Sequence, residues 1–196
     1  MRFFRFLMAS LVISLAGCQL AQTPDPVEYA YDTFGIDLPK GKQLYLAYNI
    51  WFSNPLQISP LNYHSGTIIP FGTPVDIVKA GENSVTFQKK GSIRQFTIEN
   101  DYAVTLLRDR AFYNQIFTTK NPDDLYKNLD EASLADMKNG IVKANMTREQ
   151  VLSVFGPPPK FLNPLSEITW TYYLSPDLKT IHIVFKDDKI SYIFEN

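Results

Sequence analysis

Between residues 40 and 100, apolar and polar positions alternate in short runs. Residues 44–51 have apolar side chains at every second position and aromatic or small ones between, as in a strand that is apolar on both faces. Further short runs follow at 66–69, 73–78, 85–88 and 94–98, separated by Gly, Pro, Asn and Lys. Four or five strands spaced roughly ten residues apart predict a small antiparallel sheet or barrel over residues 40–100.

After residue 100 the spacing of apolar residues changes from that of strands to that of helices. Apolar residues recur at helical spacing from Leu106 to Phe117. The segment 121–124, Asn-Pro-Asp-Asp, is typical of a helix start, because it offers a capping side chain, a proline at the first helical position and acidic residues at the dipole's positive end. We therefore expect a helical connector over 101–129. A further helical stripe runs from Leu134 to Ile141, with Gly140 as its stop.

The last segment, 130–196, shows the clearest pattern. Thr147 and Gln150 have the spacing of a capping box, and Gly156 followed by three prolines ends the helix they begin. Alternating runs at 168–174, 181–185 and 190–194 predict three strands, with a tight turn at 187–188. The apolar set of the last strand, Ile190, Tyr192 and Phe194, is expected on the core face. The prediction is two helices followed by a three-stranded antiparallel meander.

The chain is thus expected to be an α+β protein with two folded parts. On the far face of the second sheet the alternation places Tyr173, His182, Val184 and Ile193. A face that is polar with scattered apolar and aromatic groups suits partner docking, so these residues are candidate partner-binding residues. Phe161, in the stiff loop after the helix, is a further candidate. The alternatives are that this face packs on the first domain and that the loop is only a crossover.

The first 39 residues have a different character. Two arginines precede an apolar run over residues 6–16 that is too short to span a bilayer, which predicts a secretory signal peptide over 1–17. Residues 18–39 contain three prolines and little periodicity, as in a tether. The sequence Leu15-Ala16-Gly17-Cys18 resembles a bacterial lipobox. The resemblance implies cleavage between Gly17 and Cys18 and a covalent lipid on Cys18. With Gln19 in place of aspartate, it implies an outer-membrane location facing the periplasm. An ordinary signal peptide ending near a cysteine is the alternative.

Composition and charge argue against several classes of function. The chain is 45% hydrophobic and 14% aromatic, with a net charge of −1, so it offers no basic footprint for nucleic acid. Cys18 is the only cysteine; once lipidated, it leaves no disulfide, thiolate nucleophile or cysteine metal ligand. The histidines, His64 and His182, show no ligand spacing, and the adjacent aspartate pairs are explained by a helix start and a turn. We therefore expect no enzyme activity, metal, cofactor beyond the lipid, or small-molecule substrate.

Several motifs of the last third resemble a known family. "MTREQV" at 146–151 runs into "FGPP" at 155–158, and "WTYY" at 170–173 precedes "IVFKDDKISYI" at 183–193. This part of the chain resembles the SmpA/OmlA (BamE-like) outer-membrane lipoproteins. The resemblance implies their two-layer fold and the β-barrel assembly machinery as a partner. The turn-then-strand rhythm of residues 66–77 resembles bacterial SH3-like domains.

The expected function is a lipid-anchored, non-enzymatic adaptor in envelope biogenesis, acting in outer-membrane protein assembly or envelope integrity. One alternative is a peptidoglycan-binding module in which Tyr45, Trp51 or Tyr63 lines a glycan groove. Another is an inhibitor of a periplasmic hydrolase, because the same two-layer fold occurs in β-lactamase inhibitor proteins.

Overall fold

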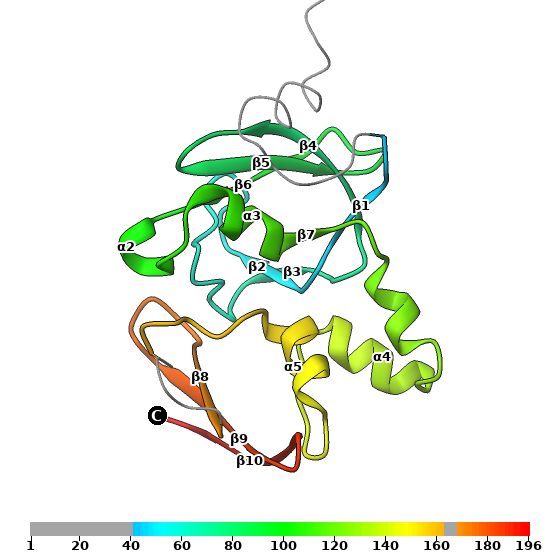
Figure 1. Cartoon of the computed structure of the whole chain (residues 1–196), viewed down its shortest axis with the longest axis vertical. Coiled ribbons are helices and arrows are strands. Elements are labelled where there is room, and N and C mark those ends of the chain that lie inside the picture. Colours follow the sequence, from blue (N-terminus) through cyan, green and yellow to red (C-terminus); the bar gives the residue numbers. More distant parts are fainter. Residues whose placement is uncertain (1–40, 163–167) are drawn as a thin grey trace, which may run out of the picture.

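The computed structural model describes residues 41–162 and 168–196, which form two α+β units stacked end to end (Figure 1). The first unit contains a five-stranded antiparallel sheet in the order β6-β5-β4-β1-β7, and a separate antiparallel pair, β2 and β3. The strands of the larger sheet are β1 (Leu44–Leu46), β4 (Pro74–Ala80), β5 (Ser84–Lys89), β6 (Gln95–Glu99) and β7 (Phe117–Thr118). The pair consists of β2 (Ile50–Phe52) and β3 (Thr67–Ile69).

The strands expected between residues 66 and 98 are confirmed as β3 to β6. The run at 44–51 forms two strands instead of one, because the chain turns between β1 and β2 at the fully buried Asn49. The Asn49 side chain donates through Nδ2 to the Met137 carbonyl at 2.8 Å and accepts the Phe71 N–H through Oδ1 at 2.9 Å. The turn therefore lets one buried amide satisfy polar groups of two distant segments.

Helices α2 (Tyr102–Thr105) and α3 (Asp109–Ile116) follow the sheet. The helical pattern expected from Leu106 to Phe117 was too long at both ends. Leu106 ends α2 with a left-handed φ of 57°, and Phe117 belongs to β7, where it pairs with Leu46 of β1. The inner side of α3 packs into the first hydrophobic core with Phe112, Tyr113 and Ile116. The segment after residue 100 is therefore part of the first unit's core as far as Phe117.

The second unit begins with a 3₁₀ turn, η1 (Pro122–Tyr126), which Asn121 caps by accepting the Asp123 N–H. Helices α4 (Glu131–Lys138) and α5 (Arg148–Phe155) follow, and then the strands β8 (Thr169–Tyr173), β9 (Thr180–Lys186) and β10 (Lys189–Glu195). Both halves of the capping box at Thr147 are present, with bonds of 3.3 and 2.8 Å to Gln150. The two helices and the antiparallel meander are confirmed.

A β-bulge in β10 reverses the faces of its last residues. The turn residues Asp187 and Asp188 both have positive φ, as a tight two-residue hairpin requires. Ile190 pairs with Phe185, but the register then shifts, so that Tyr192 pairs with Val184 and Ile193 with Ile183. Because Ser191 is the extra residue, every later side chain changes face. Ile193 therefore packs against the core, and its assignment to the partner-binding face was wrong.

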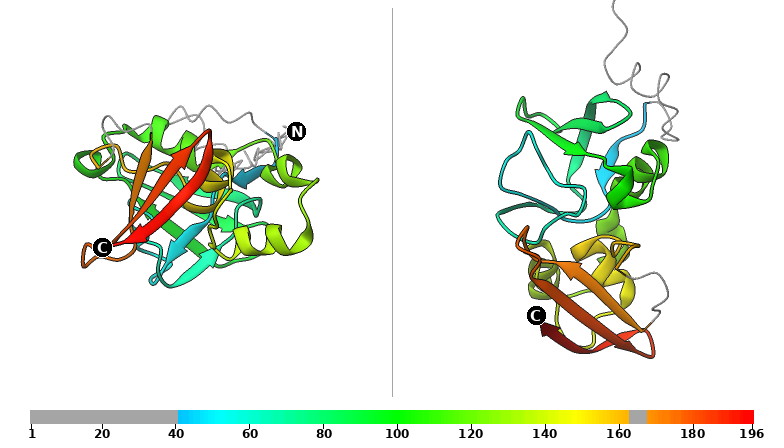
Figure 2. Two further views of the ribbon diagram at one scale, coloured as in Figure 1. Left: turned by 90° about the horizontal axis from the view of Figure 1, so that it is seen from below. Right: turned by 90° about the vertical axis from the view of Figure 1, so that its left-hand side faces the viewer.

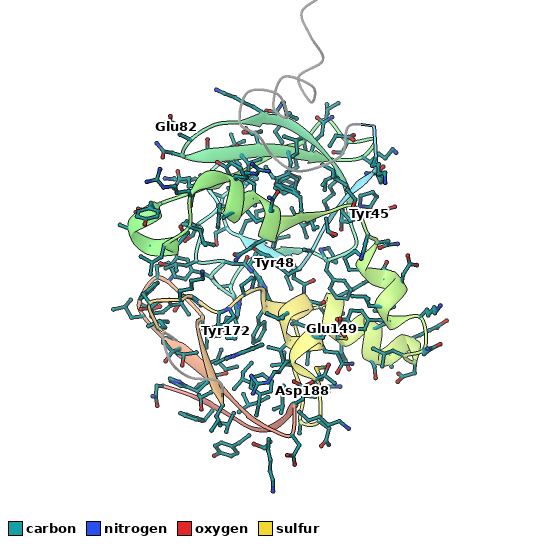
Figure 3. All side chains as sticks on the ribbon, viewed as in Figure 1. Tyr45, Tyr48, Glu82, Glu149, Tyr172 and Asp188 are labelled. Atoms are coloured by element: carbon teal, nitrogen blue, oxygen red, sulfur yellow. The ribbon has the colours of Figure 1, made fainter. Side chains whose placement is uncertain are left out.

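The two units meet at an apolar and hydrogen-bonded junction. Each has its own core, and Phe71 of the first unit packs into the second core against Tyr126. Gly140 lies so close to Trp51 that a Cβ there would stand 2.2 Å from the indole. Figure 3 shows Tyr48 and Tyr172 at this level of the molecule, between the two sheets. Such close backbone approach indicates that the units pack as one body.

Candidate functional site: the outer face of the C-terminal sheet

The side of β8–β10 that faces away from α5 is the candidate site, and we call it the outer face (Figure 2). Strand pairing arranges it in three rows across the sheet. The rows are Thr169, Val184 and Tyr192, then Thr171, His182 and Phe194, then Tyr173, Thr180 and Asn196. The face therefore combines hydroxyls on β8 with aromatic groups on β10 around a central histidine.

His182 is held in place from three sides. Its Nδ1 lies 2.9 Å from the Thr171 hydroxyl and its Nε2 lies 3.1 Å from the Thr180 hydroxyl. Its ring stacks on Phe194 with centroids 4.6 Å apart and planes inclined by 15°. The Asn196 side-chain amide also lies 3.4 Å from Nε2, so two hydroxyls and an amide surround the ring nitrogens. This arrangement fixes the imidazole as part of a surface.

The apolar part of the outer face lies along β10. Tyr192 is 64% exposed and Phe194 is 37% exposed, and their ring centroids are 5.8 Å apart. Val184, half-buried, adds an aliphatic side chain beside Tyr192. Large exposed aromatics next to each other are the residues that supply most of the energy of protein interfaces. The outer face is thus suited to bind an apolar surface of a partner.

Tyr173 and Phe161 lie together at the opposite edge of this face. The Phe161 ring, in the loop after α5, is 6.1 Å from the Tyr173 ring, which is in turn 6.3 Å from Tyr63 of the first unit. The His64 N–H also donates to the Tyr173 carbonyl. The first unit thus contacts the outer face at the edge that contains Tyr173. The opposite edge, which contains Tyr192, remains exposed.

The junction fixes the C-terminal sheet relative to the first unit. Asn62 is buried; its Oδ1 accepts the Trp51 N–H, and its Nδ2 donates to the carbonyls of Asn49 and Phe155. His64 lies beside it, with its ring 3.9 Å from Phe155. Burial lowers the pKa of His64 to about 3, against the opposing effect of the Phe155 carbonyl, so the ring is neutral at physiological pH.

Sequence reasoning placed Tyr173, His182 and Val184 correctly and missed two residues of the outer face. Tyr192 and Phe194 were expected in the core, because they continue the alternation that begins at Ile190. The bulge at Ser191 carries no sequence signal. The burial of His64 was also missed, since the turn-like segment around it is polar.

Clefts also lie elsewhere in the described part of the molecule, and two of them border residues considered for glycan binding. One, of about 550 Å³, is lined by Tyr45, Thr118, Lys120 and Leu125 with their neighbours. The other, of about 330 Å³, is lined by the hairpin β2 region, including Trp51 and Tyr63. Trp51 packs on Gly140, and its indole N–H is buried. Its main contacts are therefore at the junction between the two units, and not in a groove that could hold a glycan.

The lipidation and cleavage residues, Cys18 and Gly17, lie outside the described residues. In the parts that are described, 41–162 and 168–196, no group of three or more His, Cys, Asp or Glu side chains is placed to hold a metal ion. The helices of those same parts all fall short of the length and hydropathy that crossing a bilayer takes.

Comparison with known proteins adds no relative. A scan of protein-family models finds no match to this chain, and searches of curated proteins and of solved structures find none either.

Proposed function

We propose that this chain is a lipid-anchored outer-membrane lipoprotein that acts, without catalysis, as an adaptor in envelope biogenesis through its outer face. The observation that carries the proposal is the exposed aromatic pair Tyr192 and Phe194 beside the fixed His182 ring. Interfaces draw their affinity from a few such aromatic side chains. An anchor at Cys18 would confine the protein and an envelope partner to one surface and so raise their effective concentration.

The proposal extends to the fold of both units. Two helices followed by a three-stranded antiparallel meander, with a capping box before α5, support a BamE-like C-terminal unit. In the first unit, β4, β5 and β6 form an antiparallel meander, β1 lies beside β4, and β7 lies beside β1. This strand order supports a small SH3-like unit at the N-terminus. On this basis we further propose the β-barrel assembly machinery as the partner, with support of outer-membrane protein assembly as the role.

The test replaces the exposed aromatic pair in cells. A Tyr192→Ser, Phe194→Ser double variant is compared with a matched Leu56→Ser, Leu178→Ser variant, whose side chains are 62% and 67% exposed elsewhere on the surface. The first is expected to lose crosslinks to assembly subunits and to leave a deletion strain detergent-sensitive. The second is expected to restore the strain. Full restoration by the aromatic variant refutes the adaptor role of this face.

The anchor is tested separately. Cys18→Ala is expected to release the protein from the membrane fraction and to abolish the same crosslinks, because the partner is then no longer concentrated on one surface. Crosslinks that persist at the wild-type level in the Cys18→Ala protein would show that lipidation does not contribute to partner binding.

A second candidate function is binding of peptidoglycan strands. The cleft beside Tyr45 favours it, because an aromatic ring bordered by Thr118, Lys120 and Asp124 combines a stacking surface with polar groups for sugar hydroxyls. The protein is then expected to sediment with purified cell wall, and Tyr45→Ala is expected to abolish sedimentation. The adaptor role predicts no sedimentation with cell wall for either protein.

A further inference from the structure

The loop between β5 and β6, residues 89–94, projects an isoleucine into solvent among three basic residues. Ile93 is 97% exposed. Lys90 and Arg94 on either side of it are exposed and Lys89 is half-buried. In the described part of the chain none of the three forms a salt bridge with a carboxylate. Lys89 and Arg94 lie over the Phe96 ring, 5.8 and 5.5 Å from its centroid. The loop thus presents an almost fully exposed isoleucine among three positive charges that no carboxylate of the described residues neutralises.

The conformation of this loop is fixed by its own hydrogen bonds. The Ser92 N–H donates to the Lys89 carbonyl, and the Ser92 hydroxyl accepts the Arg94 N–H at 3.1 Å. Gly91, between them, has a φ of +76°. The turn is therefore set before any partner arrives, and little conformational entropy is lost when Ile93 is bound.

The loop lies where the described chain begins. The Lys90 ammonium donates to the Gln43 side chain, and the Lys90 N–H donates to the Pro74 carbonyl at the start of β4. Lys42, exposed, adds a further positive charge at this place. In Figure 1 this end of β4 and β5 lies beside the start of β1, where the described residues begin. The chain that would join an anchor at Cys18 to the described body therefore enters that body beside the loop.

We infer that residues 89–94 form a membrane-contact loop that binds the surface of an anionic phospholipid bilayer. Ile93 enters the boundary between headgroups and acyl chains, and Lys89, Lys90 and Arg94 lie against lipid phosphates, as apolar side chains and cations do in interfacial segments. The binding itself rests on the described residues. Its consequence, that the body is oriented with the outer face directed away from the bilayer, rests on the proposed anchor at Cys18.

The experiment places a fluorophore at the loop tip of the full-length lipoprotein. Because Cys18 is the only cysteine, a chain whose Cys18 carries lipid takes label only at an introduced thiol. Ile93→Cys, labelled with an environment-sensitive dye, is compared with Leu178→Cys, which is exposed on the second unit. Both are reconstituted into vesicles of phosphatidylcholine alone or with phosphatidylglycerol added. The intact mass reports the lipid on Cys18 independently of the dye.

The dye at position 93 is expected to shift to the emission of an apolar environment, and to be quenched by lipid-borne quenchers, when phosphatidylglycerol is present. The dye at position 178 is expected to stay in water in both vesicles. Adding Lys90→Gln or Arg94→Gln to the first protein is expected to lower the ratio of inserted to free loop about fivefold for each charge removed, and salt is expected to act in the same direction. A dye at position 93 that stays in water in both vesicles overturns the proposal, even where the mass confirms a lipid on Cys18.

Discussion

His64 makes the junction between the two units sensitive to acid, and His64→Phe tests this. The imidazole lies in a box formed by Trp51, Phe155 and Tyr172, with ring centroids 5.6, 3.9 and 5.5 Å away. Both ring nitrogens are buried, and among the described residues neither has a partner within hydrogen-bond geometry, although the Phe155 carbonyl is near enough to oppose the lowering of the pKa. Phenylalanine keeps an aromatic ring in the box but takes up no proton, so the variant isolates the protonation of this one residue.

The magnitude follows from the difference in pKa between the folded and unfolded chains. Burial lowers the pKa of His64 from 6.5 to about 3 in the folded protein. Between these values the unfolded chain binds a proton that the folded chain does not, so the free energy of unfolding falls as the pH falls from 6.5 towards 3. The expected slope from this residue is about 1.4 kcal/mol per pH unit, or about 3 kcal/mol over two units.

The assay is urea unfolding followed by tryptophan fluorescence, since Trp51 borders the same box. Both proteins are measured at intervals from about pH 7.5 to about pH 4.5, and the quantity compared is the slope of stability against pH. Carboxylates contribute equally to both slopes, and any packing change from the larger ring is a constant offset. The wild-type slope is expected to exceed that of His64→Phe by about 1.4 kcal/mol per unit below pH 6.5. Equal slopes would refute the reasoning.

Three further changes test the packing at and near the junction, each by urea unfolding at neutral pH. Asn49→Ala leaves the buried Phe71 N–H without its Asn49 partner, whereas the Met137 carbonyl keeps the Gly140 N–H, so the change is expected to cost about 2 kcal/mol. Gly140→Ala forces a Cβ against Trp51 and is expected to cost several times more than Gly91→Ala, which has a similar positive φ but open space around it and should cost about 1 kcal/mol. Thr147→Ala removes a helix cap and is expected to cost about 1 kcal/mol.

The elements that could be predicted from the sequence are those whose signals are local. The helix beginning at Arg148 was predictable, because its cap, its apolar face and its glycine stop all lie within ten residues or so of one another. The turn at Asp187 was predictable for the same reason. Local signals also placed His182 on the outer face, because the side chains of β9 alternate regularly between the two faces of the sheet.

The features that could not be predicted depend on distant partners. The break in the strand at Asn49 exists because Met137 and Phe71 supply its hydrogen bonds, and neither is near it in the sequence. The change of face after Ser191 depends on pairing with β9, which lies outside the local alternation of the last strand. The acid-sensitive position of His64 arises only when α5 and the first unit meet.

The loop at residues 89–94 and the outer face of β8–β10 lie at opposite ends of the same body. The junction between the two units determines how these two surfaces are oriented relative to each other. The loop around Ile93 projects from the first unit where the described chain begins, whereas Tyr192 and Phe194 lie on the last strand of the second unit (Figure 1). Because Asn62 and Asn49 join the units by buried hydrogen bonds, binding at the loop would fix the direction of the outer face. Loss of the junction in acid is therefore expected to release the outer face from the orientation set by the loop, whether or not Cys18 carries the proposed lipid. Under the proposed adaptor role, binding of a partner at the outer face is then expected only while the two units remain packed.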